Sequence, residues 1–385
     1  MLGARTSSAE KEAVGTYQSK IRALMIKLIH LRGLESEEQS IIQLFDLLTS
    51  ECLSTSLESN LPPLSLICND GTPLQFCISL SRDRSSAQEL RYLTEVCMPG
   101  MLLPERTKLA RSKIPAILES VGAEKYLHMV SALLDTILPQ ERLLPDHPML
   151  GIWFGARHRR GFPQALRLYC KLLWELGDPW VMCCQALDLV GIAGSLEEVR
   201  RSLGAHCRPT SIGFECSALG FGRAKLYLRG YGLTRSDVLG YVESIGCTRF
   251  GQDYARFHEA FVGGKDAYIP RSVVLSVDLC KTPEERQGLK FEIGPSFYVK
   301  DDIEVRKCIE ELACKFALNT VPYEQVLNMI SENVLVPGSM NYHDVVGIGC
   351  DASEVPRLTI YLRLNLRGHS ATLGQVSESH PVRTG

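Results

Sequence analysis

The sequence predicts an α+β fold in which ten antiparallel strands close into one barrel inside a ring of helices. Short segments recur in which polar and apolar residues alternate with period 2, as in residues 223–229, where Arg223, Lys225 and Tyr227 share one face. The opposite face of each segment is uniformly apolar. Pairs of these segments alternate with pairs of helical segments five times along the chain. Such hairpins close naturally into a barrel whose polar faces look inward and whose apolar faces pack on surrounding helices.

Each element follows from its local pattern. Apolar residues recurring at helical spacing predict two N-terminal helices, at 8–31 and 37–54. A short apolar strand is expected between Pro63 and the turn that begins at Asn69. The barrel strands are then predicted at 74–81, 90–96, 150–155, 164–170, 212–216, 223–229, 273–279, 288–293, 345–350 and 357–364, with a basic loop at 156–161. The helices between them are predicted at 105–120, 123–138, 179–190, 195–204, 234–246, 251–262, 301–318 and 322–333.

The chain is expected to form a single domain over residues 1–365. Residues 1–58 supply the N-terminal helices and residues 60–365 the five αββα repeats of the barrel. Residues 366–385 are polar and contain Gly, Ser and Pro, which is typical of a loose tail.

Composition limits the classes of function. A net charge of −2 over 385 residues argues against a general nucleic-acid binder, whose surface would be basic, so any anion site must be a local concentration of cations. Fourteen scattered cysteines without a C-x-x-C pair indicate a reducing, cytoplasmic environment. An N-terminus without an apolar core and the lack of a long apolar run predict neither a signal peptide nor a membrane span. The histidines lack zinc-binding spacing, so no metal site is expected.

The inward faces of the predicted strands converge on one set of cations and aromatic rings. Arginines and lysines on facing strands would clamp an anion such as a phosphate, and interleaved aromatic faces can stabilise a carbocation. One strand of this kind would usually be a solvated sheet face, but five recurrences favour a site. The predicted inward residues are Gln75, Arg91, Trp153, Arg167, Tyr169, Glu215, Arg223, Lys225, Tyr227, Asp278, Lys290, Glu292 and Tyr361.

Two common phosphate-binding devices are missing from the sequence. There is no G-x-x-x-x-G-K-[ST] motif, which excludes a P-loop enzyme. There is no D-D-x-x-D motif either, because Asp301 and Asp302 have no later partner at that spacing. Side-chain cations, rather than a metal held by aspartates, would therefore bind a diphosphate.

Together these residues resemble the aromatic prenyltransferases of the dimethylallyltryptophan synthase type, whose barrel of αββα units is called the ABBA fold or PT-barrel. The resemblance spans about residues 60–365 and is closer to bacterial members. Residues 70–76 (DGTPLQF) resemble the family's D-G-[ST]-P-x-E-[FL] strand, and residues 90–95 (LRYLTE) its V-R-[FY]-x-x-E strand. Residues 166–169 resemble the K-x-Y strand, and residues 223–227 the R-x-K-x-Y strand, which is the most specific. Residues 289–293, followed by Pro295, Asp301 and Asp302, resemble the Q-x-Y strand and the sequence after it, and residues 359–361 resemble the last strand.

The resemblance implies roles for particular residues. The diphosphate of an allylic donor would be bound by Arg91, Arg167, Arg223, Lys225 and Lys290. Tyr169, Tyr227 and Tyr361 would shield the allyl cation, with Trp153 beside them in the substrate site. The implied co-substrate is dimethylallyl diphosphate or a longer homologue, and the implied partner is a small aromatic acceptor. No cofactor is required, with Mg²⁺ at most stimulatory, and the protein would be a monomer or homodimer.

Two positions depart from the family pattern. The carboxylate of the first strand, which in the family bonds the indole N–H, is Gln75 here, and the tyrosine of the Q-x-Y strand is Glu292. An amide keeps an acceptor oxygen but cannot take a proton at neutral pH. The base would then be Glu215, Glu292 or the released diphosphate, and the acceptor tryptophan, another indole, a phenol or a peptide.

Two other functions fit a charged barrel. A triphosphate-tunnel phosphohydrolase would need an E-x-E-x-K strand and metal-binding carboxylates, for which Lys290 and Glu292 are a poor substitute. A barrel without catalytic activity could bind a phosphorylated or hydrophobic ligand.

Overall fold

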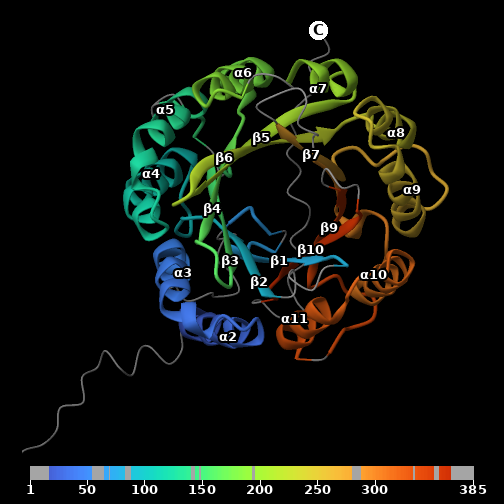
Figure 1. The fold of residues 1–385 in the computed structure, drawn as a ribbon, viewed down its shortest axis with the longest axis horizontal. Coiled ribbons are helices and arrows are strands. Elements are labelled where there is room, and N and C mark those ends of the chain that lie inside the picture. Colours follow the sequence, from blue (N-terminus) through green and yellow to red (C-terminus); the bar gives the residue numbers. More distant parts are fainter. Residues whose placement is uncertain are drawn as a thin grey trace, which may run out of the picture.

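Ten antiparallel strands close into a barrel in the computed structural model, which confirms the predicted fold class (Figure 1). The structure describes residues 17–53, 65–68, 70–82, 88–139, 144–146, 149–192, 196–279, 288–332, 334–350 and 355–365. Each strand pairs with its neighbours in the sequence, and β1 pairs with β10 to close the ring. The strands are β1 (Leu74–Leu80), β2 (Glu89–Thr94), β3 (Ile152–Arg159), β4 (Ala165–Lys171), β5 (Cys207–Ser217), β6 (Gly220–Gly230), β7 (Val273–Leu279), β8 (Leu289–Ile293), β9 (His343–Cys350) and β10 (Arg357–Arg363).

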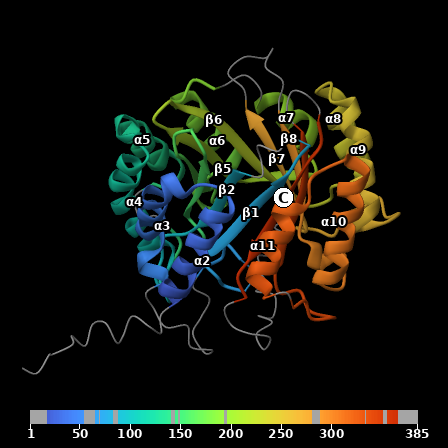
Figure 2. The ribbon, with the colours of Figure 1, turned by 60° about the horizontal axis from the view of Figure 1, so that its bottom comes forward.

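Helices surround the barrel and cover its outer face, as Figures 1 and 2 show. They follow the strand pairs in order, so each segment of the ring is supplied by the chain between two hairpins. The helices are α2 (Tyr17–Leu31), α3 (Glu38–Leu53), α4 (Leu103–Ser120), α5 (Leu127–Ile137), α6 (Pro179–Leu189), α7 (Leu196–Leu203), α8 (Arg235–Ser244), α9 (Thr248–Val262), α10 (Asp302–Phe316) and α11 (Val321–Ser331).

The hydrophobic core lies between the barrel and the helices. Tyr92 of β2 meets Phe45 of α3 edge to face, with ring centroids 5.7 Å apart. Across the barrel, Phe291 of β8 packs in the same way on Tyr254 of α9. These side chains are less than 2% exposed. The apolar residues of each strand therefore face outward onto helices, which leaves the alternate, polar residues to fill the interior.

Three local expectations were wrong. Strand β3 continues to Arg159, through residues expected to form a basic loop, because its pairing with β2 extends to Glu89. The hairpin of β5 and β6 is also longer than predicted at both ends. Residues 65–68 form no strand; Ser65 N–H instead donates to the carbonyl of Gly71, at 3.1 Å, within a turn. The predicted N-terminal segment up to residue 16 and the tail at 366–385 lie outside the described residues, so the domain boundaries stay predictions.

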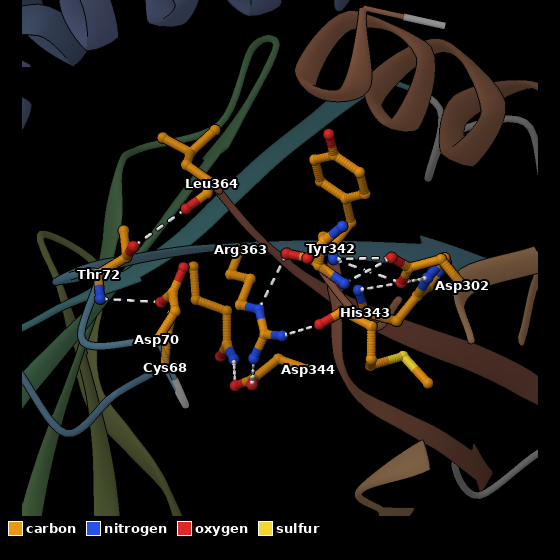
Figure 3. Close-up of polar contacts among 12 residues, drawn as sticks. Cys68, Asp70, Thr72, Asp302, Tyr342, His343, Asp344, Arg363 and Leu364 are labelled. Atoms are coloured by element: carbon orange, nitrogen blue, oxygen red, sulfur yellow. Dashed lines mark hydrogen bonds and ion pairs between the residues drawn. The ribbon is translucent and has the colours of Figure 1, made fainter. Parts of the chain in front are cut away.

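A bulge in β9 gives two consecutive residues opposite environments. The register between β9 and β10 shifts, so that Tyr361 faces Val345 whereas Leu362 faces His343, and Asp344 is the extra residue. His343 points outward, toward Asp302 of α10 (Figure 3). Asp344 contacts Gln75 and Arg363, which lie on the inner face of β1 and β10. Bulges re-aim side chains in this way, and they are common next to functional sites.

Within the described residues, no helix combines the length and the apolar character that a membrane crossing requires.

Candidate active site

The strand register brings the predicted site residues to one interior. Across neighbouring strands, Trp153 lies beside Tyr169, and Lys225 lies beside Asp278. A second row joins Tyr227, through Ser276, to Lys290. The remaining predicted residues occupy the same inward positions of their strands, by the period-2 rule, or contact these rows directly: Gln75, Arg91, Arg167, Glu215, Arg223, Glu292 and Tyr361.

The five basic residues of the predicted site are each paired with a carboxylate. Arg167 Nη2 lies 2.6 Å from Glu215 Oε2, and Lys290 Nζ lies 2.5 Å from Glu292 Oε1. Asp278 forms ion pairs with two cations: its Oδ2 accepts from Arg223, and its Oδ1 lies 3.3 Å from Lys225 Nζ. These pairs hold the cations in fixed positions on different strands, so an incoming anion would find them pre-arranged.

The cations of this network differ in depth. The side chain of Arg223 is 42% exposed, whereas that of Lys225 is 10% exposed and that of Lys290 is 12% exposed. The guanidinium is therefore reached by solvent, and the two ammonium groups lie deep between the strands. A bound anion would contact the arginine at its accessible end and the lysines at its buried end.

Burial and crowding disfavour the charge on Lys225. Desolvation is the largest cause, and the neighbouring charges of Lys290 and Arg223 add to it, so the pKa of Lys225 is well below its usual value. Burial likewise lowers the pKa of Arg223, to about 10. An anion placed among these groups would add negative charge, which favours the protonated form of Lys225.

An aromatic cluster adjoins the cations. Trp153 and Tyr169 stack with ring centroids 5.2 Å apart and planes 1° from parallel, and Tyr227 lies 5.7 Å from Tyr169. The strands on both sides of Tyr169 carry glycine opposite its ring. A Cβ at Gly155 would come within 3.1 Å of the ring, and one at Gly213 within 3.0 Å. The glycines therefore create the space in which the tyrosine ring lies.

Tyr361 links the aromatic residues to the buried cations. Its hydroxyl accepts a hydrogen bond from Lys290, whose Nζ lies 4.9 Å from the centre of the tyrosine ring. Tyr361 pairs with Cys77 on β1, on the inner face. Aromatic faces and cations thus line one continuous surface from β3 to β10, which suits a ligand with an anionic end and an unsaturated apolar end.

Gln75 lies on β1, the strand next to the one that carries Tyr361, and is 4% exposed. Its Nε2 donates to Asp344 Oδ2 at 2.6 Å, and Arg363 Nη1 donates to the other oxygen of Asp344 at 3.1 Å. The carboxylate that the first strand lacks therefore stands beside Gln75, supplied by β9.

The sequence alone did not reveal four residues of this interior. Arg157, which donates to Glu215 at 3.1 Å, was assigned to a loop, and Glu89, the partner of Arg91, preceded the predicted start of its strand. Asp344 lay one residue before its predicted strand. Arg363 follows Tyr361 by two residues in the predicted strand 357–364, so alternation places it on the same inward face, but its partner Asp344 cannot be read from the sequence. Longer strand ends and the bulge explain all four cases.

The two candidate bases have different surroundings. Glu215 accepts from both Arg157 and Arg167. Burial alone would raise its pKa, but the two arginines outweigh burial and hold the pKa below its usual value, which makes Glu215 a weak base. Glu292 is paired with one cation, Lys290, and is 6% exposed.

Asp301 and Asp302 lie outside the barrel, at the start of α10. Asp301 accepts from the backbone N–H groups of Ile303 and Glu304 and caps the helix. Asp302 is fully buried and accepts from backbone N–H groups at residues 341–343 and from His343 Nδ1 (Figure 3). These aspartates join a helix to the barrel. In the described part of the chain, no three His, Cys, Asp or Glu residues are grouped closely enough to hold a metal ion.

No protein-family model and no curated protein sequence matches the chain. Solved structures of similar fold do match the chain. PriB, in a binary complex with product diphosphate, has a TM-score of 0.75 at 17% identity, over 90% of this chain and 95% of that chain. The 6-dimethylallyltryptophan synthase from Micromonospora olivasterospora, in complex with DMASPP and Trp, has a TM-score of 0.74 at 18% identity, over 91% and 97%.

AnaPT from Neosartorya fischeri is a more distant neighbour, with a TM-score of 0.64 at 11% identity, over 93% of this chain and 94% of that chain. The predicted closeness to bacterial members is thereby confirmed at the level of fold. The ten-stranded barrel of this chain is the PT-barrel fold of the aromatic prenyltransferases.

Proposed function

We propose that the protein transfers a prenyl group from its diphosphate to an aromatic acceptor. The observation that carries the proposal is the joint placement of buried cations and an aromatic cluster on the inner face of one closed barrel. An allylic diphosphate has the matching chemistry, with an anionic head and an unsaturated tail. PriB has been solved with L-tryptophan and dimethylallyl thiolodiphosphate, and such a pair of ligands is the class we propose for this chain.

The reaction begins when the bond between the allylic carbon and the diphosphate oxygen breaks. The electron pair leaves with the diphosphate, where Arg223, Lys225 and Lys290 would stabilise the departing charge. The allyl cation lies against the faces of Tyr169, Tyr227 and Tyr361. A nucleophilic ring atom of the acceptor then forms the new bond, and loss of its proton restores aromaticity. Glu292 or the released diphosphate would take that proton, because Glu215 is held by two arginines.

Gln75 would hold the acceptor without acting as the base. Its position on the inner face of β1 matches the strand that, by resemblance, contacts the acceptor, and its oxygen can accept a hydrogen bond from an indole N–H or phenol O–H. The acceptor class we propose is a tryptophan-like indole, or another aromatic that bears such a donor.

Incubation with dimethylallyl diphosphate and a panel of indoles, phenols and aromatic peptides, followed by mass spectrometry, tests the proposal. The expected result is an aromatic product heavier by one isoprene unit. The aromatic cluster beside the cations favours this outcome over phosphohydrolysis, which would release orthophosphate from inorganic triphosphate. Turnover of triphosphate without prenylation would overturn the proposal, and so would binding of the donor without any reaction.

A further inference from the structure

The Gln75 amide is held on one side by an ion pair. Asp344 Oδ2 accepts from Gln75 Nε2 at 2.6 Å, and Asp344 Oδ1 accepts from Arg363 Nη1 at 3.1 Å. All three residues are buried. Arg363 is itself fixed by the backbone, because its Nε donates to the carbonyl of Asn341 at 3.0 Å and its Nη2 to that of Met340. The arginine therefore keeps Asp344 in place (Figure 3). Asp344 in turn holds the amide of Gln75.

This arrangement determines which end of the amide remains for a ligand. A carboxylate paired with a guanidinium is ionised and can only accept hydrogen bonds. The NH₂ group of Gln75 must then face Asp344, which leaves the carbonyl oxygen to accept from something else. Among the described residues, Asp344 is the hydrogen-bond partner of the Gln75 side chain.

We infer that Asp344 is a positioning residue, which orients Gln75 so that its carbonyl oxygen selects an acceptor carrying an N–H or O–H donor. The inference rests on the proposed function and names the acceptor class within it. The bulge of β9 places Asp344 on the inner face, so a carboxylate from β9 controls an amide on β1. An acceptor whose donor is methylated would leave the oxygen of Gln75 without a partner.

The contact between Gln75 and Asp344 can be tested without an activity assay. The thermal unfolding of the wild type and of the variants is measured at several pH values. Gln75→Glu sets two carboxylates side by side, which raises the pKa of one of them in the folded protein. A raised folded-state pKa gives stability that is present at low pH and lost as the pH rises through that pKa. We expect the Tm deficit of Gln75→Glu to grow between about pH 5 and about pH 8. Adding Asp344→Asn should abolish this growth, because the new amide donates to the new carboxylate.

The positioning role is tested by pairs of acceptors that differ in one methyl group, such as indole with N-methylindole and naphthol with its methyl ether. The wild type should prefer the unmethylated member by about 2- to 12-fold in Kd or KM, the value of one neutral hydrogen bond. Asp344→Asn frees the amide to turn and should reduce this ratio toward one. The double change Gln75→Glu with Asp344→Asn should restore it, because a carboxylate again faces the acceptor. Binding of inorganic diphosphate, a probe of the cation cluster, should stay unchanged in all three variants.

Acceptor binding is measured by calorimetry with inorganic diphosphate present, so the result does not require turnover. If the wild type prefers the unmethylated acceptor and Asp344→Asn does not, the result supports the inference, whether or not any aromatic is prenylated. If no aromatic is prenylated, only the proposed function fails. The inference is overturned by an unchanged ratio in Asp344→Asn, by a pH-independent Tm deficit in Gln75→Glu, or by binding of neither member of either pair.

Discussion

His343 and Asp344 are consecutive residues of β9, yet they belong to two hydrogen-bond networks on opposite faces of the barrel. On the outer face, Asp302 accepts from backbone N–H groups and from His343 Nδ1, and His343 Nε2 lies 2.8 Å from the hydroxyl of Tyr323. On the inner face, Asp344 accepts from Arg363 and from Gln75.

The two networks differ in how they end. The outer network is closed: its carboxylate is fully buried, and its hydrogen-bond partners come from the backbone and one histidine that joins α10 and α11 to the barrel. The inner network ends on the amide of Gln75, whose NH₂ group donates to Asp344, so its carbonyl oxygen is left to accept from another donor. Closed networks hold a fold together, whereas a network with one acceptor left over can recognise a ligand. The two faces also differ in composition. The outer face packs apolar side chains on the helices, whereas the interior holds cations paired with carboxylates.

The largest expected effect is on the outer network. Asp302→Ala leaves His343 and several backbone N–H groups without their buried partner, which should lower the free energy of unfolding by about 3–5 kcal/mol. Chemical denaturation measures this loss. Activity per folded molecule should be unchanged, and Asp301→Ala, which removes a helix cap and one contact to the Gly338 N–H, should cost less because it leaves no histidine without its partner. Equal stability of Asp302→Ala and wild type would show that the outer network does not hold the fold.

The next effect concerns the inner cations. Lys225→Ala removes one charge-assisted contact to the donor, worth about 1.5–3 kcal/mol, so kcat/KM for the prenyl diphosphate should fall roughly 10- to 150-fold. Steady-state kinetics measures the change, and Lys27→Ala, at an exposed position of α2, is the matched control. A folded Lys225→Ala protein that uses donor at the wild-type rate would remove Lys225 from the donor site.

The lowered pKa of Lys225 makes donor binding depend on pH. An anion binds the protonated form of Lys225. The affinity for diphosphate should therefore be highest below the pKa that Lys225 has in the unliganded protein, and it should fall as the pH rises through that pKa. Arginine stays charged throughout this range, so Lys225→Arg should shift the alkaline fall to higher pH. Titration calorimetry with inorganic diphosphate gives both curves, and identical curves would contradict the assignment.

A smaller effect is expected at Gln75. Gln75→Ala removes one neutral hydrogen bond to the acceptor, worth about 0.5–1.5 kcal/mol, so acceptor KM should rise while donor KM stays constant. If both constants and the product pattern match those of the wild type, Gln75 serves only to bond Asp344.

No effect is expected from metal removal. The cations of the inner face are side chains, and the two consecutive aspartates serve as a helix cap and an outer-face hydrogen-bond acceptor. Activity should therefore persist in excess EDTA, as initial rates with and without chelator would show. Complete loss of activity that Mg²⁺ restores would place a metal at the diphosphate.

The sequence predicted the barrel well because strand alternation and helical periodicity are local patterns. Arg223, Lys225 and Tyr227 share a face in any extended segment, and the apolar residues between them must face the helices. The predicted helices agree with the observed ones to within a few residues wherever the structure describes them.

The ion pairs between strands could not be predicted, because they depend on the register between segments far apart in the sequence. Asp344 is separated from Gln75 by 269 residues, and only a bulge brings it to the inner face. Arg157 extends a strand beyond its apolar alternation, so its inward position became visible only from its pairing with Arg91. Local patterns therefore identified most of the cations and three of their carboxylates, Glu215, Asp278 and Glu292, but not which cation each carboxylate holds.

The most direct test of the central claim is a product balance. The purified protein is incubated with dimethylallyl diphosphate and a tryptophan-like acceptor, and released diphosphate, prenyl alcohol and prenylated aromatic are measured together. If the cations and aromatic rings of the interior direct the allyl group to an acceptor shielded from water, nearly every diphosphate released should be matched by one prenylated aromatic. Release of diphosphate with prenyl alcohol alone, or of orthophosphate, would contradict the account.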